Sequence, residues 1–311
     1  MKLIFCGTPE FAVPTLEAVI AAGHEVALVV TQPDRAVGRS QEMHAPRVKR
    51  AALAHGVAVA QPEKIKANAE FRAQLEAIAP DAILVAAYGR IIPRWMLDLP
   101  RFGNINLHGS LLPKYRGAAP IQWAVANGET MTGVTTMRID EGLDTGDMLL
   151  AHTVPIAPEE TAADLFESLA DCGAELMVET LRKLECGLIT PQPQDHALAT
   201  LAPILTREDG RIDFARNAKQ IHDRWRGFQP WPGAYTSLRG KKLIVHRMKA
   251  ACGSFPALAP GELHVDHDAI FAGCGGRSVV AFEDVQLEGK KRMGAAEFLR
   301  GFQLKSGERL G

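Results

Sequence analysis

An asparagine and a histidine, Asn106 and His108, stand two positions apart at the end of the short apolar segment GNINLH (103–108). Side chains two apart on a strand share a face, so these two polar groups project together and Leu107 points the other way. An amide and a protonated imidazole both donate hydrogen bonds, and two such donors can stabilise an oxyanion during acyl transfer. The alternative is that Asn106 caps the strand end and His108 is an ordinary semi-buried ring. Spacing alone leaves both interpretations open.

A carboxylate that orients or charges the imidazole would complete such a site. The acidic segment IDEGLDTGD (139–147) offers four, which are Asp140, Glu141, Asp144 and Asp147. Aspartates are also common in turns that have no chemical role, so the sequence spacing does not choose among the four.

The elements that would position these groups alternate between strand and helix. Apolar runs predict strands at 3–7, 25–31, 57–60, 81–88 and 103–108, and helical periodicity predicts helices at 11–22, 46–55, 68–78 and 161–184. This order predicts a doubly wound, Rossmann-like α/β domain with a parallel sheet covered on both faces. Strands at 132–139 and 148–155 form a hairpin-like extension at the sheet edge. Ligands of such sheets bind beyond the carboxyl ends of the strands, where Asn106 and His108 fall.

The chain changes character near residues 186–203, where three prolines and little periodicity indicate a linker. A helix at about 215–225 and several short strands with glycine turns follow, which favours a small OB-like β-barrel. We therefore expect a catalytic domain at 1–188, a linker at 189–205 and a C-terminal domain at 206–311.

Charge is distributed unevenly between these parts. Residues 206–311 carry 18 Lys and Arg against 12 Asp and Glu, or +6, whereas residues 1–205 carry 17 against 24, or −7. A basic C-terminal third favours a polyanionic partner, nucleic acid first, although solvated charge without function is the alternative.

Several classes of protein are disfavoured. The five cysteines are scattered without a C-x-x-C pair, which indicates reduced thiols and no structural zinc, and no metal-ligand spacing occurs. The turn Gly7-Thr8-Pro9 is not G-x-G-x-x-G, which disfavours a nicotinamide-dependent dehydrogenase. No leader or membrane-span pattern is found. We expect a cytoplasmic monomer that has no membrane partner.

The segment from Asn106 to Leu149, NLHGSLLPKYRGAAPIQWAVANGETMTGVTTMRIDEGLDTGDML, resembles the core of the formyltransferases that use 10-formyltetrahydrofolate. The stretches FCGTPEFAVPTLEA, TQPDRAVGR, AAYGRIIP, FQPWPGAY and EGKKRMGAAEFL extend the resemblance over essentially the whole chain. The tail is similar to that of members that formylate the α-amine of methionine on initiator tRNA. The resemblance implies a catalytic trio of Asn106, His108 and Asp144, with the folate as co-substrate and no metal.

The resemblance also implies binding residues. The folate is expected beside Tyr88, Gly89, Arg90, Ile91, Ile92, Ser110, Leu111, Leu112, Pro113, Asp140 and Gly142, largely through backbone contacts. The initiator methionyl-tRNA is expected to contact Arg39, and the basic C-terminal patches add Lys241, Lys242, Arg247, Lys249, Lys290, Lys291 and Arg292. Members of the family commonly have two lysines after G-R-G, where this chain has Ser40, Gln41 and Glu42. Fewer positive charges there weaken or move the phosphate contact.

Other functions remain as alternatives. A sugar-nucleotide or other amine formyltransferase would use the same folate donor, and a glycinamide ribonucleotide transformylase resembles only the first two-thirds. The hydrolase module of formyltetrahydrofolate dehydrogenase would continue into a longer chain. An RNA-binding protein without catalysis would explain the basic C-terminal domain but leaves Asn106, His108 and Asp144 without a role.

Overall fold

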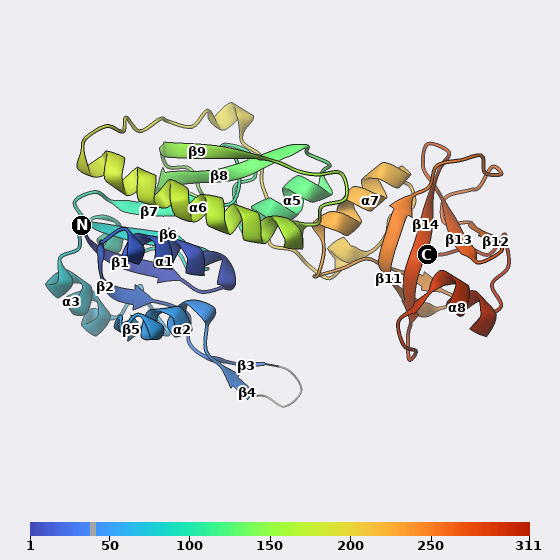
Figure 1. The fold of residues 1–311 in the computed structure, drawn as a ribbon, viewed down its shortest axis with the longest axis horizontal. Coiled ribbons are helices and arrows are strands. Elements are labelled where there is room, and N and C mark those ends of the chain that lie inside the picture. The colour runs from blue at the N-terminus through green and yellow to red at the C-terminus, as the bar shows by residue number, and fades with distance from the viewer. Residues whose placement is uncertain (38–41) are drawn as a thin grey trace. The chain divides into compact units, whose positions relative to one another are not determined.

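The protein is described by a computed structural model that covers residues 1–37 and 42–311 (Figure 1). The chain divides into two compact units. The first consists of Met1–Pro120, Met131–Pro155 and Leu165–Pro203, and the second of Ile121–Thr130, Ile156–Asp164 and Ile204–Gly311. None of the helices in the described ranges is long and apolar enough to cross a membrane.

The first unit is built, within the described residues, on a mixed sheet of seven strands. In spatial order these are β5 (Val59–Ala60), β2 (Glu25–Val30), β1 (Lys2–Gly7), β6 (Ala82–Ala86), β7 (Asn104–His108), β8 (Met131–Arg138) and β9 (Met148–Pro155). Strands β5 to β7 are parallel, and β8 and β9 are antiparallel. The α/β prediction and the edge hairpin are therefore confirmed.

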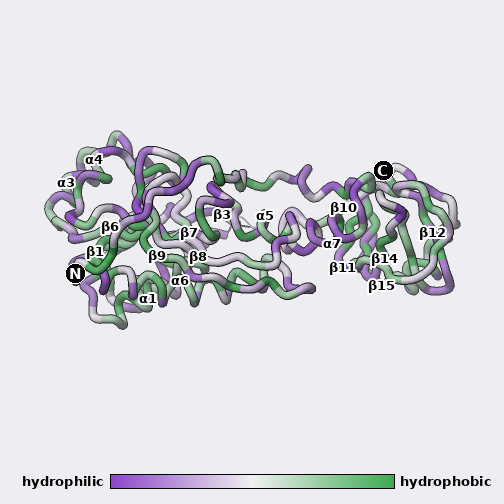
Figure 2. The backbone as a smooth tube through the Cα atoms, turned by 90° about the horizontal axis from the view of Figure 1, so that it is seen from above, coloured by the Kyte–Doolittle hydropathy of each residue, from purple (hydrophilic) through white to green (hydrophobic). Residues whose placement is uncertain are grey.

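Helices cover both faces of this sheet, as the continuous apolar strands predict. Figure 2 shows α1 (Val13–Ala21) and α6 (Ala162–Glu185) on one side, and α3 (Ala69–Ile78) and α4 (Arg94–Leu97) on the other. Helix α2 (Arg47–Ala54) packs against α1. Because both faces are covered, neighbouring strand residues such as Ile4 and Phe5 are both fully buried.

Helix ends follow the local sequence. The Asn68 side chain caps α3 by accepting a hydrogen bond from the Phe71 backbone N–H at 3.0 Å. In the second unit, Asn217 and Gln220 form a capping box at the start of α7 (Ala218–Gly227).

Several short elements are absent from the sequence-based prediction. Strands β3 (Arg35–Val37) and β4 (Glu42–His44) form an antiparallel pair that the sequence patterns did not indicate. The helices α4, α5 (Pro120–Ala126) and α8 (Ala295–Gly301), with the 3-10 helices η2 (His196–Leu198) and η3 (Glu208–Gly210), were not predicted either, whereas η1 (Glu10–Ala12) falls largely within the helix expected at 11–22. These elements are only a turn or two long, too short for a helical period to register.

The second unit is an antiparallel sheet that forms a partly closed barrel, which confirms the OB-like expectation. Its strands are, in spatial order, β10 (Tyr235–Leu238), β11 (Lys241–Ala250), β14 (Ser278–Leu287), β13 (Ala269–Cys274) and β12 (Leu263–Asp266), and β15 (Met293–Gly294) pairs with β14. Two C-terminal residues bridge the edge strands β10 and β12 of this sheet. Leu310 pairs with Leu238 at the end of β10, and Arg309 pairs with Glu262 just before β12. Apolar side chains of α7 and α8, among them Ile221 and Phe298, share its core.

The segment expected to be a linker makes ordered contacts with the first unit. Gln192 exchanges backbone hydrogen bonds with Met148 at 2.9 and 2.8 Å, and Ala202 donates to the Arg116 carbonyl at 2.7 Å. The second unit also includes residues 121–130 and 156–164, which sequence patterns did not separate from the first. The domain limits at 188 and 206 stay a prediction.

Candidate active site

Asn106 and His108 lie on the face of β7 that points away from α6. The intervening Leu107 packs against α6 so closely that a Cβ built on Gly173 would lie 2.6 Å from its Cδ2 atom. Strand alternation therefore directs Asn106 and His108 to the opposite face, at the carboxyl ends of the parallel strands. The Asn106 amide makes no hydrogen bond with any residue that the structure describes. The His108 ring, in contrast, is 5% exposed and forms a hydrogen bond with the backbone of the following loop.

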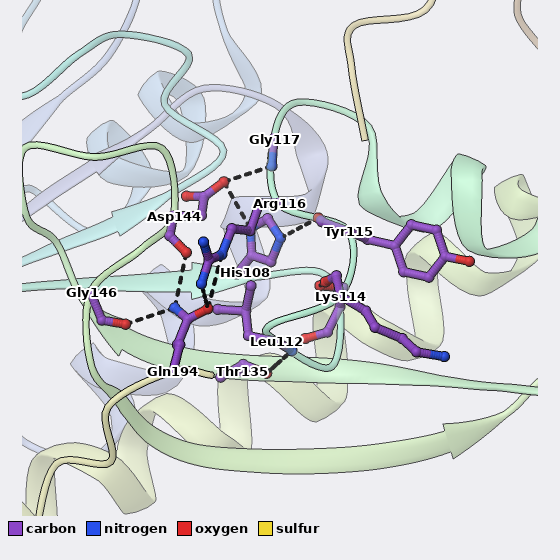
Figure 3. Close-up of polar contacts among 11 residues, drawn as sticks. His108, Leu112, Lys114, Tyr115, Arg116, Gly117, Thr135, Asp144, Gly146 and Gln194 are labelled. Atoms are coloured by element: carbon purple, nitrogen blue, oxygen red, sulfur yellow. Dashed lines mark hydrogen bonds and ion pairs between the residues drawn. The ribbon is translucent and has the colours of Figure 1, made fainter. Parts of the chain in front are cut away.

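The imidazole of His108 has a fixed orientation. Its Nε2 lies 2.9 Å from the backbone oxygen of Tyr115, and because a carbonyl oxygen only accepts, Nε2 carries the hydrogen. Its Nδ1 faces the Oδ2 atom of Asp144 at 3.7 Å (Figure 3). A neutral His108 thus has its lone pair on Nδ1, on the side of Asp144, where the ring can accept or return a proton.

Asp144 is held by its own loop and by the neighbouring one. Its Oδ2 accepts a hydrogen bond from the Gly117 backbone N–H at 2.8 Å, and its Oδ1 has no partner among the described residues. Its backbone is left-handed, with φ at +51°, which is uncommon for a residue other than glycine. The side chain is 20% exposed, so the carboxylate is open to a ligand.

The other three carboxylates of the acidic loop belong to residues with different contacts, and Asp147 pairs with β8 through its backbone carbonyl, which accepts from the Arg138 N–H at 2.9 Å. Asp140 Oδ1 accepts hydrogen bonds from the Gly142 backbone N–H at 3.0 Å and the Thr145 hydroxyl at 2.7 Å, so it shapes the turn. Glu141 forms an ion pair with Arg94 of α4 at 3.4 Å. Among the described residues, Asp144 alone places a carboxylate within 4 Å of His108.

The loop after β7, residues 109–117, is ordered by polar contacts with its surroundings. The Thr135 hydroxyl donates to the Ser110 carbonyl at 2.7 Å and accepts from the Leu112 backbone N–H at 3.3 Å. The Ser110 hydroxyl donates to the Lys114 carbonyl at 2.6 Å. Ser110 and Leu112 are buried, and Leu111 and Pro113 are half-buried, so in this part of the expected folate set the side chains that a ligand can reach are those of Leu111 and Pro113.

The stretch 88–92 combines buried and exposed residues. The Tyr88 ring is 2% exposed, and its burial raises the pKa of the phenol. The Tyr88 carbonyl accepts a hydrogen bond from Gln32, which also accepts one from Arg90. Ile92 is buried, whereas Ile91 is 93% exposed. Of this part of the expected folate set, Ile91 offers the apolar side chain that a ligand can reach.

An open groove of about 500 Å³ lies at the carboxyl ends of β1, β2 and β6. Tyr88 and Gly89 line one part of it, and Arg35, His44 and Arg47 line another. Arg47 pairs with Glu10 at 3.0 Å, so the exposed Arg35 is the cation of this groove best suited to an anionic part of a substrate. No group of three or more His, Cys, Asp or Glu side chains with a metal-site arrangement occurs within residues 1–37 and 42–311.

The basic residues expected to contact tRNA fall into two groups in the second unit. Arg247 and Lys249 pair with Glu283 at 2.7 and 2.8 Å, and Arg292 pairs with Asp284 at 2.7 Å. The second group lies where the start of β11 meets the turn after β14, and consists of Lys241, Lys242, Lys290 and Lys291. These four lysines form no ion pair with any described residue, and Lys242 stacks on the Tyr235 ring. Arg39 lies outside the described residues.

Two residues next to the catalytic candidates were missed by sequence reasoning. Gln194 and Arg116 are buried beside Asp144 (Figure 3), at 5% and 6% exposure. Gln194 follows two prolines in a segment without periodicity, so no local pattern marks it. Its partners lie 48 to 78 residues away along the chain, and only folding reveals them.

The family comparisons agree with this architecture. A family model described as "Formyl transferase" matches residues 1–181, and one described as "Formyl transferase, C-terminal domain" matches residues 204–303. The α/β unit that carries Asn106, His108 and Asp144, together with the β-barrel unit, is thus that of a formyl transferase.

Relatives of high sequence identity show to which family of formyl transferases the chain belongs. The chain is 67% identical over 311 residues to the "Methionyl-tRNA formyltransferase" of Acidobacterium capsulatum, with all of both chains covered. It is 58% identical to the "Methionyl-tRNA formyltransferase" of Koribacter versatilis, covering 100% of this chain and 99% of that one. The chain belongs to the methionyl-tRNA formyltransferase family.

Solved structures share the fold at lower identity. A sugar 3N-formyl transferase, WlaRD, solved in the presence of dTDP and 5-N-formyl-THF, matches with a TM-score of 0.67 and 18% identity, covering 94% of this chain and 99% of that one. A glycinamide ribonucleotide transformylase from Symbiobacterium toebii matches with a TM-score of 0.52 and 20% identity, covering 63% of this chain and 94% of that one.

Proposed function

We propose that this chain transfers the formyl group of 10-formyltetrahydrofolate to the α-amine of methionine carried by initiator tRNA. The products are formylmethionyl-tRNA and tetrahydrofolate. The observation that carries the proposal is the arrangement of Asn106, His108 and Asp144 at the carboxyl edge of the sheet, in a chain 67% identical over its whole length to a methionyl-tRNA formyltransferase.

In the proposed mechanism the neutral amine attacks the formyl carbon, and negative charge develops on the formyl oxygen. The Asn106 amide, which has no partner among the described residues, and a protonated His108 Nδ1 donate to that oxygen. A single donor of this kind contributes about 3–4 kcal/mol of transition-state stabilisation in other enzymes. Because the amine itself is the nucleophile, the protein does not need to supply one.

The attacking nitrogen must lose a proton and the leaving N10 must gain one. Asp144 Oδ1 has no partner within residues 1–37 and 42–311, and Oδ2 lies 3.7 Å from His108 Nδ1. We propose that Asp144 accepts the amine proton directly or through water, and that the same carboxylate stabilises the protonated ring. The proton taken from the amine then passes to the leaving N10, which balances the reaction.

The substrates are proposed to bind on either side of this trio. The exposed Ile91 and the turn held by Asp140 and Gly142 offer apolar surface and backbone groups to the folate. The groove that the exposed Arg35 lines suits the negatively charged acceptor end of the tRNA. The C-terminal lysines would bind its phosphate backbone.

The structure predicts which C-terminal cations matter most for tRNA binding. We expect the double variant Lys290→Gln and Lys291→Gln to raise KM for the tRNA several-fold and to leave kcat near that of the wild type. It should also make the slope of log Kd against log salt concentration shallower by about 1–2, because each phosphate contact contributes about 0.7–0.9. Filter binding at several salt concentrations measures this slope.

Arg292→Gln is the matched control for the lysine variants, because Asp284 already neutralises the Arg292 charge. We expect a smaller change in the salt slope for this variant than for the double lysine variant. Equal slopes for the two would mean that the ion pairs do not decide which cations bind the tRNA.

A direct assay tests the proposed function. The protein is incubated with 10-formyltetrahydrofolate and methionyl initiator tRNA, and the methionine is then released and examined for a blocked α-amine. A parallel reaction supplies an amino-sugar nucleotide in place of the tRNA. Formylation of the sugar but not of the methionine would overturn the proposal in favour of the sugar-nucleotide alternative.

A further inference from the structure

Gln194 occupies a central position between the two loops that carry the site. Its Oε1 accepts hydrogen bonds from Arg116 Nε at 3.0 Å and Arg116 Nη2 at 2.6 Å. Its Nε2 donates to the Asp144 carbonyl at 2.9 Å and to the Gly146 carbonyl at 2.7 Å (Figure 3). All of the hydrogen-bonding capacity of the amide nitrogen is thus directed at the loop that carries Asp144.

The backbone of that loop needs external support. Asp144 has a left-handed φ of +51°, and such a conformation persists only where the surrounding structure determines it. Gly146 cannot be replaced without movement, since a Cβ there would lie 2.0 Å from the Arg138 carbonyl oxygen. The two hydrogen bonds from Gln194 fix the carbonyls on either side of Thr145.

Arg116 holds Gln194 in turn. Its guanidinium is buried, and its backbone N–H donates to the Thr200 carbonyl at 2.8 Å, while its carbonyl accepts from Ala202 at 2.7 Å. A second side-chain contact joins Arg116 Nη2 to His196 Nδ1 at 3.2 Å. The next residue, Gly117, is the one whose N–H binds Asp144 Oδ2.

We propose that Gln194 and Arg116 are positioning residues that hold the Asp144 carboxylate opposite His108. Gln194 acts on the backbone of Asp144, and Arg116 orients both Gln194 and the Gly117 N–H. Within segment 189–203, Gln194 then supports the loop that carries Asp144, so this segment is more than a passive tether. The inference rests on the proposed function, because it concerns the geometry of the proposed trio.

The variant Gln194→Glu separates the two sets of hydrogen bonds. A glutamate still accepts from Arg116 and pairs with its charge, but it has no N–H to donate to the Asp144 and Gly146 carbonyls. We expect kcat to fall about 10- to 100-fold, because displacement of a reacting group by about 1 Å costs up to 100-fold. KM for the tRNA should stay within about two-fold of the wild-type value, since no tRNA contact is altered.

Asp195→Asn is the matched control, because it exchanges an acid and an amide at the adjacent, exposed position. The exposed Asp195 side chain accepts a hydrogen bond from the Ala197 backbone N–H at 3.0 Å, which an asparagine oxygen can also accept. The kcat of the Asp195→Asn variant should equal that of the wild type. Thermal melting of both variants reports whether the fold is retained.

A double-mutant cycle distinguishes positioning from general damage. Gln194→Glu is combined with Asp144→Asn, and formyl transfer is followed in single turnovers. If Gln194 acts through Asp144, the Gln194→Glu substitution lowers the rate little further in a protein that already carries Asp144→Asn. An equal loss in both backgrounds, or a Gln194→Glu enzyme as active as the wild type, would overturn the inference.

If Gln194→Glu does not fold, Arg116→Lys carries the test. It keeps the buried charge but loses the paired hydrogen bonds to Gln194 Oε1. We expect kcat to fall in the same direction with KM for the tRNA unchanged, and an unchanged kcat would reject the role of Arg116. A wild-type enzyme that formylates no methionyl-tRNA would instead reject the proposed function itself.

Discussion

Replacement of Asn106 by alanine is expected to lower kcat for formyl transfer about 100- to 1,000-fold, with little loss of stability. The loss follows from removal of one of two donors to the developing oxyanion, an effect of about 2.7–4 kcal/mol in comparable sites. Stability should be retained because the Asn106 amide makes no hydrogen bond with any described residue, so its removal leaves no protein group unpaired. Single-turnover kinetics and thermal melting on the same preparation measure the two effects.

The same strand offers a control with the opposite behaviour. Asn104 points to the same face of β7, two residues before Asn106, and its amide donates to the Met96 and Leu97 carbonyls at 2.9 and 3.2 Å. Asn104→Ala should reduce stability by about 1–3 kcal/mol because it leaves buried carbonyls unpaired, while kcat of the folded protein stays close to wild type. A kcat for Asn106→Ala within about three-fold of the wild type would remove Asn106 from the mechanism.

The sequence could predict the scaffold of the site because that scaffold depends on local patterns. Apolar runs and helical periods determine where strands such as β7 begin and end, and strand alternation places Asn106 and His108 on one face. The residue types and the strand period were enough to expect that Asn106 and His108 project together at the carboxyl edge, but they left open whether the two act as donors or as ordinary structural groups.

The choice of carboxylate could not be made from local patterns. The structure shows why: Asp140 and Asp144 are four residues apart in one loop, yet one binds its own turn and the other faces His108. The left-handed backbone at Asp144 depends on contacts from Gln194 and Gly117, which are distant in sequence. Resemblance to a family supplied what the spacing lacked.

The composition of the second unit was only partly predictable for a similar reason. Residues 121–130 and 156–164 cluster with this unit although they flank β8 and β9 of the first. Their sequence carries no break in composition, and their assignment depends on how they pack against α7. Gly227 shows this packing, since a Cβ there would lie 2.5 Å from the backbone nitrogen of Ala126.

A buried ion pair on α7 leads to the largest stability effect that we expect. Asp223 and Arg226 are 5% and 4% exposed, and Asp223 Oδ1 accepts from Arg226 Nη2 at 2.7 Å. Arg226 Nη1 also donates to the Glu160 carbonyl at 2.7 Å, which joins α7 to segment 156–164 within the second unit. Asp223→Ala should lower the free energy of unfolding of this unit by about 3–5 kcal/mol, because it leaves the guanidinium buried without its carboxylate.

Two further variants distinguish the charge effect from the loss of packing. Lys219 also pairs with Asp223, at 2.6 Å, but its side chain is 73% exposed, so Lys219→Ala should cost no more than about 1 kcal/mol. The double variant Asp223→Leu with Arg226→Met removes both charges and should be closer to the wild type than Asp223→Ala. If the double variant is the less stable of the two, the hydrogen bond from Arg226 to Glu160 matters more than the unpaired charge.

Tryptophan fluorescence makes this measurement specific to the second unit. Three of the four tryptophans, Trp123, Trp225 and Trp231, belong to that unit, and Trp95 lies in the first. Urea unfolding followed by fluorescence therefore reports mainly the barrel unit, whereas far-ultraviolet circular dichroism reports both, and a protein of two units need not unfold in one step. For Asp223→Ala the fluorescence transition should move to lower urea while the part of the dichroism signal from the first unit stays in place. A shift of both transitions together would mean that the ion pair supports the whole chain rather than the second unit alone.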